Sequence, residues 1–107
     1  MAKALISVPK IAKKGEIVEI RILIQHVMET GFRPIPNGGF VPRDIINRVV
    51  CTYDGAVVFA ADLYPAMSAN PFLAFSTVAT RTGAVTFRWI DDKGRSESDS
   101  ALMTVEA

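Results

Sequence analysis

The chain has 107 residues and a net charge of +1, which is far from the strongly basic balance of a nucleic-acid-binding protein. Half of its residues are hydrophobic and 21% are charged, a composition typical of folded chains and not of disordered ones. We therefore expect one domain, residues 1–107, with one hydrophobic core and no nucleic-acid partner.

Export and membrane signals are weak in this sequence. The N-terminal residues MAKALISVPK contain no apolar core of the length that an export signal needs, so we expect this chain to carry no signal of its own. The longest uncharged run, Leu63 to Thr80, is interrupted by Pro65 and Pro71. That run predicts a loop followed by a strand, and we expect no membrane contact.

Strand signals begin near the N-terminus. Ala4 to Val8 is a short apolar run closed by Pro9, which predicts a first edge strand because proline cannot donate to an inner ladder. A turn through Gly15 follows. Apolar side chains then alternate with polar ones as far as Gln25, which predicts a long central strand with one buried face. The buried set is Val18, Ile20, Ile22 and Ile24.

Further strands follow at short intervals. Asp54-Gly55 between the runs Ile45 to Tyr53 and Ala56 to Leu63 predicts a hairpin with a type I′ turn. We expect Val57, Phe59, Ala61 and Leu63 to share one face of the second strand. Phe72 to Thr80 is predicted as a strand that Thr82-Gly83 turns into a further strand, Ala84 to Asp91, with Trp89 in the core, and a last strand ends the chain. About seven strands without helical periodicity predict an all-β, antiparallel, immunoglobulin-like sandwich.

The segment from Glu29 to Asp44, ETGFRPIPNGGFVPRD, contains three prolines and three glycines. A long loop that proline stiffens is typical of a binding surface. His26, the only histidine, precedes it and allows two interpretations. It is either a hydrogen-bonded residue that holds the start of the loop, or a group that faces a partner or ligand.

Few residues could carry catalysis or a metal. Cys51 lies in the middle of a predicted strand, where a buried structural thiol is expected. One histidine and one cysteine are too few ligands for the copper site known in β-sandwiches, so we predict no metal and no cofactor. Asp91 and Asp92 are expected to be solvent-facing turn formers. The alternative is a small redox or thiol-dependent enzyme that uses Cys51 with His26 as its base.

Five motifs together resemble the SoxZ family, the small subunit of the SoxYZ sulfur carrier. They are HVMETG at 26–31, VPRDII at 41–46, CTYDG at 51–55, ANPF at 69–72 and TGAVTFRWIDDKG at 82–94. The resemblance covers essentially the whole chain. It implies an immunoglobulin-like, non-catalytic scaffold that forms a heterodimer with SoxY in the periplasmic thiosulfate-oxidation system.

The resemblance also implies a different role for each of the two subunits. SoxY carries the substrate covalently on a cysteine in a flexible glycine-rich arm, whereas this sequence closes with ALMTVEA. Members of the family usually lack an export signal and are thought to travel to the periplasm with SoxY. Other Sox enzymes are expected to dock on the complex. Whether the isolated chain forms a homo-oligomer is left open. A free-standing ligand-binding sandwich is the remaining alternative.

We expect the partner-facing surface to combine the end of the long strand with the start of a later one. Both places carry polar residues beside a stiff loop. The candidate residues are His26, Met28, Thr30, Gly31, Asn70, Pro71 and Phe72.

Overall fold

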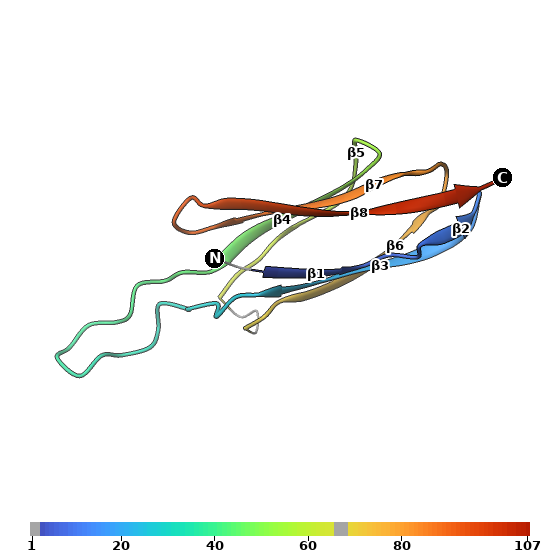
Figure 1. Ribbon diagram of the computed structural model, residues 1–107. Helices are drawn as coiled ribbons and strands as arrows, with labels where there is room; N and C mark the ends of the chain where they lie inside the picture. Colours follow the sequence, from blue (N-terminus) through green and yellow to red (C-terminus); the bar gives the residue numbers. More distant parts are fainter. Residues whose placement is uncertain (1–2, 66–68) are drawn as a thin grey trace.

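The computed structural model describes residues 3–65 and 69–107, and within these residues the chain forms two β-sheets that pack face to face (Figure 1). The strands are β1 (Lys3–Ser7), β2 (Ile11–Lys13), β3 (Ile17–Gln25), β4 (Ile46–Tyr53), β5 (Ala56–Asp62), β6 (Phe72–Val78), β7 (Gly83–Asp91) and β8 (Ser96–Glu106). The predicted all-β sandwich is confirmed. None of the described residues belongs to a helix long and apolar enough to cross a membrane.

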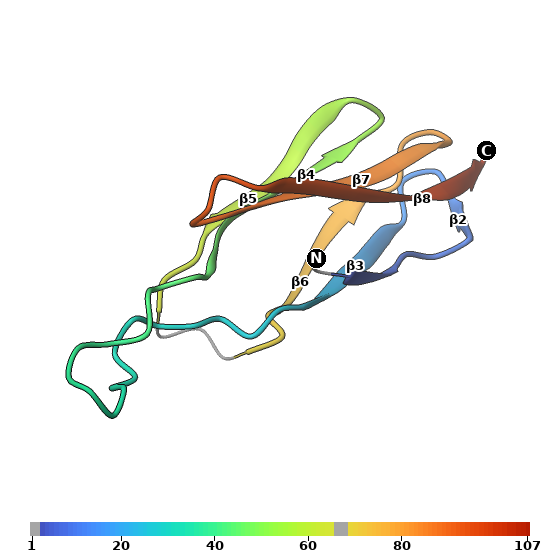
Figure 2. The same cartoon turned by 60° about the vertical axis from the view of Figure 1, so that its left-hand side comes forward.

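The smaller sheet has the order β1-β3-β6 and the larger one has the order β2-β8-β7-β4-β5 (Figure 2). β1 is an edge strand and β3 is central, as the sequence predicted. The count of about seven strands missed β2, which lies between the predicted first strand and the turn through Gly15. β2 pairs in parallel with β8, whereas the other paired strands are antiparallel.

The core lies between the two sheets. The four aliphatic residues of β3 that alternate with polar ones are 0–3% exposed. Val85, Phe87 and Trp89 face them from β7 in the same buried cluster. Full burial of an aliphatic side chain contributes about 1.5–3 kcal/mol, so this alternating set fixes which face of each strand points inward.

The β4–β5 hairpin turns at Asp54 and Gly55, where φ is 50° and 85°. Both angles are positive, as a type I′ turn requires. The expected position of Val57 was wrong, because Cys51 pairs with Phe59 whereas Thr52 pairs with Val57. Val58 is therefore an extra residue, a β-bulge in β5. The bulge turns Val57 to the face opposite that of Phe59 and leaves it 64% exposed.

Tyr53, the last residue of β4, connects the two sheets through its hydroxyl. The Tyr53 oxygen accepts hydrogen bonds from the backbone N–H groups of Thr80 (3.2 Å) and Arg81 (3.0 Å), and it donates to the carbonyl of Arg81. Thr80 and Arg81 belong to the connection from β6 to β7, which passes from one sheet to the other. One side chain therefore satisfies several backbone groups at this crossing.

We predict that Tyr53→Phe lowers the free energy of unfolding by about 1–3 kcal/mol, because it leaves part-buried backbone donors without an acceptor. Chemical denaturation followed by tryptophan fluorescence measures the change. Tyr64→Phe is the matched control, since Tyr64 is 66% exposed. Equal stability of the two variants would show that the Tyr53 hydroxyl does not contribute.

Candidate partner-docking site

Residues 27–43, which we call the arm, leave the end of β3 and return to β4 as an extended ribbon. The arm projects from one end of the sandwich in both views (Figures 1 and 2). Its two sides are bridged at Pro34–Phe40, and Glu29 is bridged to Asp44, the residue that directly follows the arm. The Val41 N–H also donates to the Arg33 carbonyl across the ribbon (2.9 Å). The predicted stiff loop is therefore a hydrogen-bonded ribbon.

Gly31 allows the two sides of the arm to approach closely. Its φ of +87° lies in the region that favours glycine. A Cβ atom at this position would lie 3.0 Å from the Cβ of Arg43, across the ribbon. Any side chain at Gly31 would therefore push the two sides apart.

The arm exposes apolar side chains to solvent along most of its length. Their exposed fractions are 74% for Val27, 74% for Phe32, 41% for Ile35 and 62% for Phe40. Exposed apolar side chains that gather on one projecting element mark an interaction surface. Among the arm residues, the sequence interpretation named only Met28, Thr30 and Gly31 individually as candidates, so it missed the aromatic residues farther out.

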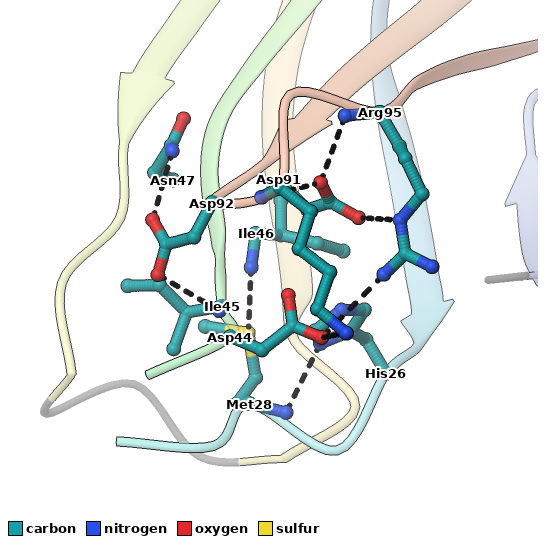
Figure 3. A network of polar contacts seen from close by, with 10 residues as sticks. His26, Met28, Asp44, Ile45, Ile46, Asn47, Asp91, Asp92 and Arg95 are labelled. Carbon is teal, nitrogen blue, oxygen red and sulfur yellow. Dashed lines mark hydrogen bonds and ion pairs between the residues drawn. The ribbon is translucent and has the colours of Figure 1, made fainter. Parts of the chain in front are cut away.

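Asp92, in the turn between β7 and β8, binds the returning side of the arm. Its two carboxylate oxygens accept hydrogen bonds from Nε (2.7 Å) and Nη2 (2.9 Å) of Arg43. They also accept from the Ile45 backbone N–H (3.1 Å) and from the Asn47 side-chain amide (3.0 Å), and Figure 3 shows these last two bonds. The hydrogen bond from Arg43 is the main reason that the pKa of Asp92 is lowered to about 2.

Asp91 organises the neighbouring turn. One of its oxygens accepts from the backbone N–H groups of Lys93 (3.0 Å) and Arg95 (2.9 Å), and the other accepts from Arg95 Nε (2.7 Å). Arg95 extends to Asp44 at 3.4 Å, and so does Lys93. Asp91 and Asp92 do form the turn, as predicted, but their solvent-facing placement was wrong, because Asp91 is 8% exposed and the Asp92 side chain 13%. Both carboxylates point instead to the place where the arm joins the sandwich, which we call its base, and hold it there.

His26 and Asn70 hold the departing side of the arm. The His26 backbone N–H donates to Asn70 Oδ1 (3.0 Å), and the Asn70 N–H donates to the His26 carbonyl (2.7 Å). His26 Nδ1 accepts from the Met28 N–H (3.0 Å), where φ of Met28 is 53° (Figure 3). These contacts match the structural interpretation of His26, as a residue that holds the start of the loop.

The expected partner-facing residues separate into two groups. Met28 is 4% exposed, its sulfur accepts from the Ile46 N–H (3.3 Å), and Pro71 is also fully buried. The surface placement of these two was wrong, because both side chains are buried. Asn70 and Phe72 are exposed, and His26, Thr30 and Gly31 are half-buried. A partner contact at these five residues stays a prediction.

His26, Asp44 and Asp91 bring one potential metal-ligand atom each to within 4.8 Å of one another, a grouping that the sequence did not indicate. Both Asp91 oxygens already accept hydrogen bonds, and His26 Nδ1 does too. The cationic groups of Arg95 and Lys93 lie beside Asp44. Positive side chains at this place oppose a metal ion, so we interpret the cluster as a structural polar network.

Cys51 lies apart from this network. Its thiol is 0% exposed, and burial raises its pKa to about 12. Asp44 lies beside His26, and the seven residues from Asp44 to Cys51 span roughly 20 Å of extended chain. His26 is therefore too far away to act as a base toward Cys51, which removes the geometry that the thiol-enzyme alternative requires.

Comparison with known proteins identifies the family. The model of the sulphur oxidation protein SoxZ family matches residues 6–102. The chain belongs to the SoxZ family. No curated protein matches the sequence.

Solved structures confirm the type of fold. SoxY, the sulfur carrier protein from Chlorobium limicola f thiosulfatophilum, is similar with a TM-score of 0.70, 13% identity, and coverage of 97% of this chain and 79% of that chain. A superoxide reductase (neelaredoxin) variant from Ignicoccus hospitalis has a TM-score of 0.76 at 14% identity, covering 96% of this chain and 79% of the other. At such identities the likeness concerns the fold alone.

The lowered pKa of Asp92 predicts acid sensitivity. Because the folded-state pKa lies below its ordinary value of 3.8, Asp92 stabilises the fold above about pH 4, and this contribution is lost as the pH falls toward 2. Asp92→Asn should cost about 1–2 kcal/mol at pH 7, after allowance for solvent screening, and much less near pH 2. Urea denaturation at several pH values measures this. A pH-independent difference would contradict it, and Glu106→Gln, at an exposed position, serves as the control.

A second prediction concerns Cys51. We expect a thiol reagent to leave the native protein unlabelled over a time in which the urea-unfolded chain reacts fully, because the thiol is buried and protonated at neutral pH. Mass spectrometry counts the labelled molecules. Rapid labelling of the folded protein would instead support a reactive thiol.

Proposed function

We propose that this SoxZ-family chain is the non-catalytic scaffold subunit that pairs with SoxY in periplasmic thiosulfate oxidation. The observation that carries the proposal is the family match over residues 6–102. In this arrangement SoxY holds the substrate covalently on a cysteine of its mobile C-terminal arm. The buried Cys51 supports this division, because a protonated thiol inside the core is a poor nucleophile.

A carrier made of two chains can combine a mobile segment with a stable fold. A segment that carries a substrate between enzymes must be long and mobile, and such a segment contributes little to a folded core. A rigid second subunit supplies a stable platform and additional docking surface. The hydrogen-bonded arm fits this role because it presents apolar side chains on a defined backbone.

The arm is the surface that we assign to docking, either of SoxY or of the Sox enzymes that act on the carrier. Aromatic side chains such as Phe32 and Phe40 are frequent among the residues that dominate binding energy. The protein needs no metal or cofactor for this role. We place it in the periplasm, exported together with SoxY.

Mixing the purified chain with SoxY tests the pairing. We expect a single heterodimer peak in gel filtration at micromolar concentration, from an interface of roughly 1,600 Å² or more with an apolar centre. Two separate peaks would contradict the proposal.

A further variant tests the arm. Phe32→Ser combined with Phe40→Ser should weaken binding of SoxY or of a Sox enzyme by about tenfold or more, because it removes two exposed aromatic contacts. Calorimetric titration against each partner measures the affinity. Tyr64→Ser, which changes an exposed aromatic residue outside the arm, is the control. Wild-type affinity of the double variant for every partner would exclude the arm as the docking surface.

A further inference from the structure

β6 has a free edge. β3 pairs with one side of β6, and no strand in the described part of the chain pairs with the other side. A strand with unpaired backbone groups is a ready template for pairing with another chain. Free edges in natural proteins usually carry protection against such pairing, for example a charge, a proline or a bulge.

The hydrogen bonds at the two ends of β6 show which backbone groups are unpaired. The Pro71 carbonyl accepts from the Ile24 N–H (2.9 Å), and Ala79 bonds to Gly15 and Glu16 through both its carbonyl and its N–H. Because backbone groups alternate sides in an antiparallel strand, the odd-numbered residues of β6 face β3. The even-numbered residues direct their N–H and C=O groups outward. They are Phe72, Ala74, Ser76 and Val78.

The other described edges carry protection that β6 lacks. β1 includes Lys3 and is followed by Pro9, β2 has only three residues, and β5 contains the bulge and Asp62. The β6 sequence FLAFSTV has no charge, no proline and no irregularity in its pairing with β3. Exposed, regular and uncharged edges are those that natural proteins avoid unless a partner covers them.

The surface beside this edge is also apolar. Phe75 of β6 stacks on Phe59 of β5, with ring centroids 4.5 Å apart, and both rings are only half-buried. A shallow hollow of about 370 Å³ at the end of β6 is lined by Val58 and Val78 and also by the ion-paired Asp54 and Arg81, so the apolar surface is limited to the part of the edge nearer the two rings. A strand added at the edge of β6 would cover part of this surface.

We propose that the free edge of β6 pairs antiparallel with the corresponding edge strand of SoxY, so that the small sheets of the two subunits form one continuous sheet. The occupant follows from the proposed pairing with SoxY and from the fold of that protein. The β6 edge itself carries no charge that would oppose an approaching strand. The structure of SoxY shares the fold over 97% of this chain, so a counterpart of β6 exists in that fold.

The β6 edge starts close to the arm. β6 begins directly after Asn70 and Pro71, which bond to His26 and Ile24 at the base of the arm. The exposed Phe72 therefore begins β6 close to the residue from which the arm departs, and one partner can contact both. This inference rests on the proposed pairing with SoxY and adds the surface and the mode of contact.

Hydrogen exchange of the wild-type chain tests the inference without any substitution. When SoxY is added, the amides of the four outward-facing residues of β6 should exchange at least tenfold more slowly, whereas the inward-facing amides are already protected by β3. Unchanged exchange of the outward amides in a complex that does form would overturn the inference and leave the proposed pairing intact. Protection that grows with the concentration of the isolated chain, without further change on adding SoxY, would identify a second copy as the occupant and also overturn it.

A matched pair of proline variants gives an independent measurement. Ser76→Pro removes an outward N–H of β6 while leaving the bonds to β3, and edge strands tolerate proline. Ala4→Pro does the same at the opposite edge, because the alternation of β3 directs the Ala4 N–H away from the sheet. We expect Ser76→Pro to weaken SoxY binding about tenfold or more and Ala4→Pro to change it less than about twofold. Equal binding by both variants would overturn the inference, and absence of binding by the wild type would instead refute the proposed function.

Discussion

The contact between Arg43 and Asp92 is the constraint on which the geometry of the arm depends. A ribbon that projects from a sandwich has no core of its own, and ordering its backbone costs about 1–2 kcal/mol per residue. Hydrogen bonds across the ribbon offset part of that cost, but they do not fix its direction. The direction is set at the base, where the Asp92 carboxylate bonds to Arg43, Ile45 and Asn47 together.

The base also connects the arm with the smaller sheet. Asp92 and Asp91 belong to the β7–β8 turn of the larger sheet, whereas His26 and Asn70 lie at the ends of β3 and β6 in the smaller one. The arm therefore departs from the smaller sheet, and its returning side is held by the larger one. A change in the packing of the two sheets would move the arm, so the rigidity of the sandwich keeps the arm in place.

Features with a short sequence period were predictable. The alternation in β3 and β7 and the Asp-Gly turn of the β4–β5 hairpin are local, and the structure has them as expected. The bulge at Val58 was not predictable, because the apolar run AVVFAA does not show where an extra residue enters. The role of Asp92 was also hidden, because its partners Arg43 and Ile45 lie more than 40 residues earlier in the chain. Met28 and Pro71 were misplaced for the same reason, since their burial depends on the folded base of the arm.

The reactive side chains and the exposed apolar side chains of this chain are used differently. Its thiol is buried, and its histidine and most of the acidic groups near it are occupied by structural bonds, so the reactive side chains are used to hold the fold. The apolar side chains of the arm and the unprotected edge of β6 have no such internal use. Leaving both exposed to solvent invites aggregation. A permanent partner that covers them would remove this hazard, and the exposed surface itself is therefore an argument that the chain functions as part of a complex.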